Sequence, residues 1–474
     1  MKYQILAYSK TLRDDGTFRL DAEHYQQQFL FNQDKLTKFG SRPLAEYIER
    51  PVMTGHTPSM QIDSYYGGTI KFVKTDNLRE FNITGEFNDY LSESGNSIIK
   101  RSALKAGDLI VTIIGATHKI VGRAALVQNK DLPANINQNI ALIRLKDGES
   151  SEFYSAYLNS RFGKYNLWYL SRQTEQVNLN CREVEKLLVP EVSNELKARI
   201  EDVYKKAVEF ESNSRLIFSS AQEIILSEIG LSNSQTKHQL SFVKNYSDTC
   251  KAERIDAEYF QPKYGEIVKA IKSYPGGWDM LENIASVKKC VEVGSDAYMD
   301  EGDIPFVRVS NLSPFEITEE KYISAELYAE LSQHQPKQGE ILFSKDGTPG
   351  IAYHLSEKPK KMIPSGGILR LKLKNKQINE DYLTLVLNSM IVQEQINRDV
   401  GGSIILHWRP EQVKQTLIPL LDDEKQRDIQ QKITESFGLR KQSKHLLECA
   451  KRAVEIAIEQ NENAAIKWLQ EKTK

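Results

Sequence analysis

Phe72-Val-Lys-Thr-Asp-Asn-Leu78 returns later in the chain as Phe306-Val-Arg-Val-Ser-Asn-Leu312, and Arg19-Leu-Asp-Ala-Glu-His-Tyr25 returns as Arg254-Ile-Asp-Ala-Glu-Tyr-Phe260. The offsets between the copies are 234 and 235 residues. Segments that recur in the same order at a nearly constant offset indicate an internal repeat. We therefore expect two copies of one structural unit.

Three further matches keep the same order, and their spacing drifts by only a few residues, as loop insertions in a duplicated chain would produce. They are Gly107–Ile110 with Gly339–Leu342, Ile140–Lys146 with Ile368–Lys374, and Leu188–Pro190 with Leu417–Pro419.

Length and composition place the chain among multi-domain globular proteins. It has 474 residues, of which 40% are hydrophobic and 27% charged, and this length suits two or three domains. No apolar run is long enough to span a membrane, and the first residues lack the apolar core of a secretory signal. The four cysteines form no C-x-x-C pair, which argues against a disulfide framework or a zinc cluster. We expect a cytoplasmic protein with no membrane contact and no metal.

Both halves show short apolar runs separated by Gly, Pro, Asn and Asp, around residues 40–190 and 276–419. This pattern is typical of strands and turns. We predict the α+β class, with two globular α/β domains related by a pseudo-twofold repeat. The expected limits are 1–190 for the first domain and 231–420 for the second.

A long helix is predicted after each domain, at 191–230 and at 421–474, with Ser193 and Asp422 as N-caps. Apolar residues in the first helix recur in a heptad pattern, and those in the second follow it more loosely. The first series is Leu196, Ile200, Val203, Ala207, Phe210, Ser214, Ile217, Ala221 and Ile224, and the second is Ile429, Ile433, Phe437, Leu447, Ala450, Val454 and Ala457. A long helix with one apolar seam needs a partner, so we expect the two helices to pair as an antiparallel coiled coil. The alternative is that each helix packs only on its own domain.

Motifs of common enzymes are absent from the sequence. We find no phosphate-binding G-x-x-x-x-G-K-[ST], no G-x-G-x-x-G and no H-E-x-x-H. The Asn-Pro-Pro-aromatic signature of amino-methyltransferases is also missing, and Asn311-Leu-Ser-Pro-Phe315 resembles it only in composition. We predict no catalytic residue and no metal ligand on this chain.

Polar and basic residues recur at equivalent places in both halves and are our candidates for contacts with DNA. The formal net charge is −1, so such a function depends on local basic surfaces. Arg370, Lys372, Lys374 and Lys376 alternate along a predicted strand and would share one face, where they can neutralise phosphates. An Asn-rich turn that begins at Asn135 offers amides for base edges. The predicted DNA-binding residues are Lys74, His118, Lys119, Asn137, Gln138, Asn139, Arg144, Arg308, Lys345, Thr348, Arg370, Lys372 and Lys374. For any one of them, a solvated surface position is an equally good interpretation.

The order of these segments, found twice and each time followed by a long helix, resembles the DNA-specificity (S) subunit of Type I restriction-modification systems. In the first half, Gly55-His-Thr-Pro-Ser59 and Tyr66-Gly-Gly-Thr-Ile-Lys-Phe-Val73 look like the opening of a target-recognition domain. In the second half, Gly302-Asp-Ile-Pro-Phe-Val307 and Gly339-Glu-Ile-Leu-Phe-Ser-Lys-Asp-Gly347 are similar to the same family. The copies differ where Gly115-Ala-Thr-His-Lys119 stands opposite Gly347-Thr-Pro-Gly350, and recognition loops should differ if each domain reads a different sequence.

This resemblance implies that each domain reads one half of a split double-stranded DNA target, with the helical pair as a spacer. It implies two methyltransferase (M) subunits, which would carry S-adenosylmethionine, and motor-nuclease (R) subunits, while this chain would carry no cofactor and no catalysis. Tyr204, Lys205, Arg440 and Lys444 flank the helical seams and are candidates for partner binding. The implied role is phage defence.

Two alternatives stay open from the sequence alone. One is the specificity subunit of a related modification or phage-defence system. The other is a coiled-coil scaffold whose globular ends bind proteins, which the helical seam and the near-zero net charge also fit.

Overall fold

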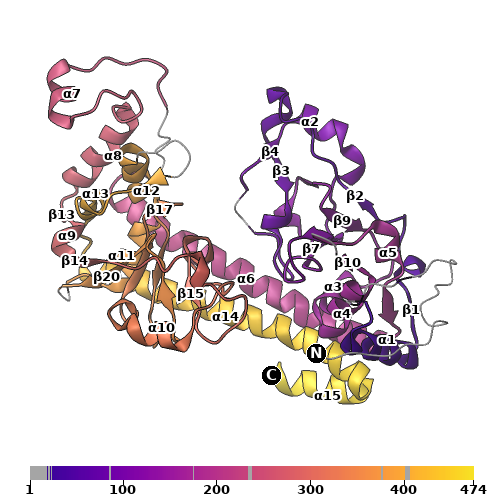
Figure 1. Ribbon diagram of the computed structural model, residues 1–474. Helices are drawn as coiled ribbons and strands as arrows, with labels where there is room; N and C mark the ends of the chain where they lie inside the picture. Colours follow the sequence, from indigo (N-terminus) through magenta and orange to yellow (C-terminus); the bar gives the residue numbers. More distant parts are fainter. Residues whose placement is uncertain are drawn as a thin grey trace. The chain divides into compact units, whose positions relative to one another are not determined.

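The computed structural model describes residues 19, 22, 24–84, 87–173, 176–232, 238–374, 377–400 and 406–473. The chain forms two compact units (Figure 1). Unit 1 comprises Met1–Glu211 and Lys441–Lys474, and unit 2 comprises Ser212–Arg440. Each unit therefore combines one domain of helices and strands with a part of each long helix.

The central sheet of unit 1 is antiparallel, in the order β2-β9-β5-β7. Its strands are β2 (Met53–Thr54), β5 (Leu109–Thr112), β7 (Ala124–Leu126) and β9 (Ile140–Ile143). Side chains alternate between the two faces of a strand, and here both faces are covered. Leu109 and Val111 belong to a core with helices α3 (Ser151–Asn159) and α4 (Arg161–Leu170). Ile110 and Leu142 belong to a second core with Val73 and Ile136.

Shorter elements complete unit 1. Strand β3 runs parallel to β8, and β1 pairs with β12. Their bounds are β1 (Ser41–Pro43), β3 (Tyr66–Val73), β4 (Tyr90–Leu91), β6 (Ile114–Gly115), β8 (Ala134–Ile136), β10 (Arg172–Gln173), β11 (Val177–Asn178), β12 (Leu188–Pro190), α1 (Gln27–Phe39), α2 (Glu93–Ile98) and α5 (Cys181–Glu185).

Unit 2 repeats the main strand pairs of this plan, without counterparts of β4 and β10 among the described residues. Its central sheet has the order β14-β20-β16-β18, which matches β2-β9-β5-β7 of unit 1. The parallel pair β15 and β19 corresponds to β3 and β8, β17 and β21 correspond to β6 and β11, and β13 and β22 correspond to β1 and β12. The bounds are β13 (Trp278–Met280), β14 (Ala285–Lys289), β15 (Phe306–Val307), β16 (Ile341–Ser344), β17 (Asp346–Gly347), β18 (Ala352–His354), β19 (Ile363–Pro364), β20 (Ile368–Leu373), β21 (Leu406–His407), β22 (Leu417–Pro419), α7 (Tyr246–Ala252), α8 (Pro262–Ser273), α9 (Leu281–Ile284), α10 (Ala325–Glu330), α11 (Glu380–Leu387), α12 (Met390–Asp399) and α13 (Pro410–Lys414). The predicted α+β class and internal duplication are confirmed.

The two long helices are α6 (Asn194–Glu228) and α14 (Asp423–Glu459). They begin where the sequence predicts, because Ser193 Oγ accepts a hydrogen bond from the Leu196 amide at 3.3 Å and Asp422 Oδ1 accepts one from the Lys425 amide at 2.9 Å. The second predicted helix is corrected at its end, since α14 stops at Glu459 and Asn461 caps a separate helix α15 (Glu462–Lys472).

The parts of α6 and α14 within each unit pair antiparallel. In unit 1, Ser443 Oγ donates to the Ala207 carbonyl at 2.7 Å, and in unit 2, Ser436 Oγ donates to the Ser214 carbonyl at 2.8 Å. Residue numbers thus rise along one helix as they fall along the other. These hydroxyls are buried and satisfied by backbone carbonyls, so they fix the register of the apolar seam without leaving an unpaired polar group.

The repeated arginines hold the end of a helix in each unit. Arg19 donates to the carbonyls of Tyr169 and Leu170, both at 3.2 Å, at the end of α4. Arg254 donates to the carbonyls of Arg398 and Asp399, at 3.4 and 3.2 Å, at the end of α12. A cation at a helix C-terminus satisfies exposed carbonyls and the helix dipole, which explains why this residue occurs in both copies.

Candidate nucleic-acid interface

In unit 1, several loops meet beside the central sheet, and we name them the unit 1 loop cluster: residues 55–58, 115–119, 137–139 and 176–178. Thr57 Oγ1 donates to Gln138 Oε1 at 2.6 Å, and the Ile113 amide donates to the Asn139 carbonyl at 2.9 Å. Gly55 is required here because a Cβ at this position would lie 1.7 Å from the Ile136 carbonyl oxygen. The β6–β11 pair adds the contact of Val177 with Gly115, and these interactions bring four separate segments of the chain together.

In unit 2, the equivalent loops form the unit 2 loop cluster: residues 291–298, 345–350, 365–367 and 406–408. The Lys345 amide donates to the Gly367 carbonyl, and the Trp408 amide donates to the Lys345 carbonyl, each at 2.9 Å. In unit 1 the Leu179 amide donates to the Ile113 carbonyl at 2.9 Å. Ile113 and Lys345 therefore occupy equivalent positions on one backbone framework.

The structure places several predicted DNA-binding residues in the unit 1 loop cluster. His118 is half-buried and stacks on Trp168, with ring centroids 5.1 Å apart, while Lys119 beside it is exposed. Gln138 is exposed and Asn139 is half-buried. Asn137 is buried and its side chain accepts a hydrogen bond from the Asn139 amide at 3.1 Å, so its role is to shape the turn.

Lys74 and Arg308 occupy equivalent positions. Each precedes a 3₁₀ turn in which an asparagine side chain, Asn77 or Asn311, accepts a hydrogen bond from the backbone amide of the basic residue, at 2.9 and 3.1 Å. Both cations already have carboxylate neighbours: Lys74 pairs with Asp89, and Arg308 pairs with Glu320 at 2.7 Å. Their positive charge is therefore partly neutralised within the unit.

Two predicted phosphate contacts, Arg144 and Arg370, are corrected by the structure. Arg144 donates to both carboxylate oxygens of Asp108, at 2.7 and 2.6 Å, and these hydrogen bonds raise the pKa of Arg144 against the effect of burial. Arg370 is 5% exposed, donates to the Gln333 carbonyl at 2.6 Å and lies 3.6 Å from Glu340. Both arginines hold their own unit together. The alternation of side chains along the strand was predicted correctly, but loop 333–335 covers Arg370 and buries it.

The other basic residues predicted on this strand are accessible. Lys372 and Lys374 are exposed, and Lys374 Nζ donates to the Glu282 carbonyl. Thr348 is exposed in the unit 2 loop cluster, whereas Lys345 is half-buried and paired with Asp346. Lys376 lies outside the described residues.

Of the predicted partner-binding residues, Tyr204 is corrected. It is 2% exposed, its hydroxyl lies 3.0 Å from Ser155 Oγ, and its ring packs against Phe81 with centroids 6.0 Å apart. Burial raises the pKa of this phenol. Lys205 and Lys444 are exposed, and Lys205 pairs with Glu201 on its own helix. Arg440 lies over the Phe315 ring at 3.7 Å.

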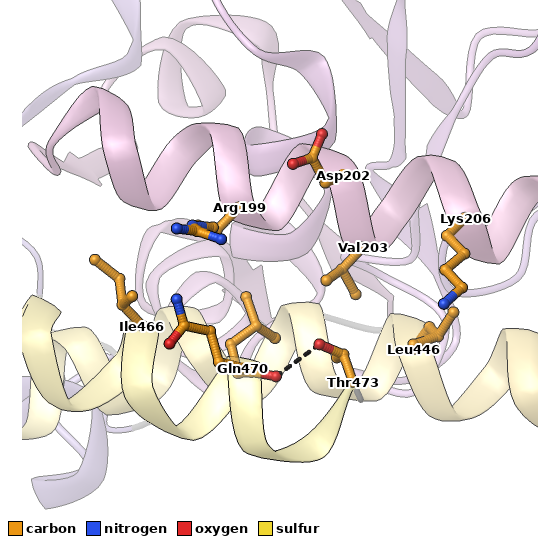
Figure 2. A pocket seen from close by; sticks show the side chains of 9 residues that line it. Arg199, Asp202, Val203, Lys206, Leu446, Ile466, Gln470 and Thr473 are labelled. Atoms are coloured by element: carbon orange, nitrogen blue, oxygen red, sulfur yellow. Dashed lines mark hydrogen bonds between the residues drawn. The ribbon is translucent and has the colours of Figure 1, made fainter.

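A groove of about 200 Å³ in unit 1 is formed by helices rather than by loops (Figure 2). Arg199 and Lys206 of α6 lie on the side of Gln470 and the end of α15, whereas the carboxylate of Asp202, which also lines the groove, points away from α15. Thr473 closes the last turn of α15 by donating to the Leu469 carbonyl at 2.8 Å. The groove combines charged side chains with apolar ones such as Val203 and Leu446.

Sequence reasoning missed Asp346 and His407. Asp346 Oδ1 lies 2.9 Å from His407 Nδ1 across the β17–β21 pair. The two residues are 61 positions apart, and although Asp346 lies within the segment Gly339–Gly347, no sequence pattern connects it with His407. The only sign of this site in the sequence was that the two copies differ in the loops that begin at Gly115 and Gly347.

Comparison with known proteins finds a family model that matches a stretch of the second half. Residues 275–448 match the family model of the Type I restriction modification DNA specificity domain. The Type I restriction enzyme MjaIX specificity subunit of Methanocaldococcus jannaschii is 26% identical over 273 residues, which cover 55% of this chain and 55% of that protein. The match thus spans about half the length of this curated relative. The resemblance predicted from the repeated segments is confirmed.

Solved structures similar to this chain include two specificity subunits. The S subunit of a Type I restriction-modification system from M. genitalium has 13% identity and a TM-score of 0.33, over 90% of this chain and 95% of that chain. The HsdS subunit from Thermoanaerobacter tengcongensis has 16% identity and a TM-score of 0.28, over 90% and 95% of the two chains. Among the described residues, no helix combines the length and apolarity needed to cross a membrane.

Proposed function

Because residues 275–448 carry a Type I restriction modification DNA specificity domain, we propose that this chain is the sequence-reading subunit of such a system and that each unit reads one half of a split DNA target. The observation that carries the proposal is one framework built twice with different loops. The sheet orders β2-β9-β5-β7 and β14-β20-β16-β18 are equivalent, while the exposed residues of the two loop clusters differ. A protein that reads two different half-sites needs a common framework to hold its loops and different loop side chains to contact different bases.

Phosphates and base edges are bound by different kinds of side chain, so the exposed residues are assigned to two different roles. Exposed lysines such as Lys372 and Lys374 suit phosphates, which set affinity and position. Side chains in the loop clusters, such as Gln138 and Thr348, suit base edges, which set specificity. Arg144 and Arg370 are left out of the proposed contacts because each is engaged inside its unit.

In this proposal the chain assembles with two M subunits and with R subunits in the cytoplasm and contributes recognition rather than catalysis. S-adenosylmethionine would bind to the M subunits. Lys205, Arg440 and Lys444 remain the proposed docking residues on the helices, and Tyr204 is excluded by its burial.

The test is selection from a random duplex library by the full chain in complex with its M subunits. The expected result is enrichment of two short base clusters separated by a gap without preference. Enrichment of no sequence at all would contradict the proposal. A scaffold that binds only proteins would give that result, together with no footprint on any duplex.

A further inference from the structure

The two units differ in chemical character at one pair of equivalent backbone positions. In unit 2, Asp346 of β17 stands opposite His407 of β21. In unit 1, Ile114 of β6 stands opposite Asn178 of β11 in the same register. The residue directly before this position also differs, since unit 1 has Ile113 where unit 2 has Lys345. An apolar pair of isoleucines in one unit is thus replaced by an ionic cluster in the other.

The ionic cluster of unit 2, Lys345, Asp346 and His407, holds its carboxylate in a defined orientation. Asp346 Oδ1 lies 2.9 Å from His407 Nδ1, and Asp346 Oδ2 pairs with Lys345 Nζ. The side chain of Asp346 is 24% exposed and that of His407 is 61% exposed. Lys345 neutralises the negative charge, which would otherwise repel phosphates nearby. A carboxylate offers about four lone-pair sites, so two hydrogen-bonded neighbours leave Asp346 able to accept more.

The backbone next to this carboxylate carries no side chains at two consecutive positions. A Cβ on Gly367 would lie 2.9 Å from Val309 Cγ2 and 3.6 Å from Asp346 Cβ, and a Cβ on Gly366 would lie 3.5 Å from Glu292 Cβ. Unit 1 has Gln138 and Asn139 at the equivalent place, directly before β9. A glycine pair allows a ligand to approach the backbone closely. The carboxylate of Asp346 therefore lies beside backbone without side chains in unit 2, whereas unit 1 carries the amide side chains of Gln138 and Asn139 at the equivalent positions.

We propose that Asp346 is a specificity-determining residue that accepts a hydrogen bond from the exocyclic amino group of a base in the half-site read by unit 2. Adenine N6 and cytosine N4 are the amino groups in the major groove, whereas guanine and thymine present acceptors there. An ionised carboxylate attracts the former and repels the latter. His407 and Lys345 are positioning residues that orient Asp346. This inference rests on the proposed function and adds to it the class of base that one unit selects.

The experiment is the library selection above, repeated with Asp346→Asn in the full chain with its M subunits. The amide of asparagine accepts and donates, so it tolerates guanine and thymine as well as the amino bases. The preference at one position of one half-site should fall by at least about fivefold, the smallest discrimination expected of a good base contact. The identity of the base in the wild-type selection separates adenine from cytosine. Glu330→Gln, an exposed carboxylate on α10, is the charge-matched control and should leave every position unchanged.

The variants His407→Gln and Asp346→Asn/His407→Gln identify the positioning role. His407→Gln should weaken the preference at the same position and no other, and the double variant should lose no more than Asp346→Asn alone, because the residues act as one group. The preferences at the other positions of the half-site read by unit 2 report on the folding of that unit in every variant. A wild-type complex that selects two half-sites and an Asp346→Asn complex with the same two half-sites would overturn this inference and leave the proposed function standing. A wild-type complex without any preference would overturn both.

Discussion

Unit 1 and unit 2 are alike in what holds them together and different in what they expose. Asp108 and Glu340 accept hydrogen bonds from the amides of Lys105 and Lys337, at 2.7 and 3.0 Å, and each pairs with an arginine, the half-buried Arg144 or the buried Arg370. Asn159 and Asn388 donate to equivalent strand carbonyls, Ala124 and Ala352, at 3.0 and 2.8 Å. The loop clusters share backbone hydrogen bonds but not side chains. The contacts that recur in both units therefore stabilise the shared backbone framework. The residues that read DNA bases are to be sought in the loop clusters, where the side chains of the two units differ.

The largest expected effect is on the free energy of unfolding, when a carboxylate that pairs with an arginine of the shared framework is removed. Asp108→Ala leaves the half-buried Arg144 without its carboxylate, and Glu340→Ala leaves the buried Arg370 without one, so each should lower the free energy of unfolding by about 3 kcal/mol. Asp108→Ala should cost more, because Arg144 binds both of its oxygens whereas Arg370 also has two backbone carbonyls. Denaturant unfolding monitored by circular dichroism measures both. Unchanged unfolding midpoints would show that these ion pairs do not stabilise the two units.

A somewhat smaller effect is expected from the aromatic contacts between a loop and the helices. Phe81 of unit 1 is 5% exposed and packs on Tyr204, whereas Phe315 of unit 2 is half-buried between Phe218 and Arg440. Phe81→Ala should destabilise by about 3 kcal/mol, as expected for a buried phenylalanine. Phe315→Ala should cost about 1 kcal/mol, because its ring is only partly buried and its cation–π contact is modest. Equal losses of unfolding free energy would show that the two loops pack equivalently.

The smallest effect concerns charge on the surface of unit 2. Lys372→Ala/Lys374→Ala should weaken binding to all duplexes by a similar factor and flatten the slope of log K against log salt by about one for each phosphate that is no longer neutralised. Fluorescence anisotropy at several salt concentrations measures this slope. Lys269→Ala, an exposed lysine on α8, is the matched control. An unchanged slope in the double variant would reject these two lysines as phosphate ligands.

Much of the fold followed from local patterns in the sequence. Apolar spacing predicted the antiparallel pairing of the long helices, and Ser193 and Asp422 marked their starts because N-capping depends on one side chain and the next turn. The strand period placed Arg370 and Lys372 on one face, but it contains no information about loop 333–335, which buries only Arg370. Tyr204 was misjudged for the same reason, since its partner Phe81 comes from a distant segment.

The candidate site was harder to predict than the fold. Asp346 and His407 meet only because β17 pairs with β21, and such long-range pairing leaves no periodic trace in one chain. The mismatch between Gly115–Lys119 and Gly347–Gly350 pointed to the correct loops without naming the residues that matter.

The most direct test of the account is methylome sequencing of a host that carries this chain with its M subunits. If two divergent units on one duplicated framework read DNA, the modified motif should contain two different base clusters separated by unspecified bases. A single uninterrupted motif, two identical half-sites, or no modified motif despite expression of an active complex would contradict it.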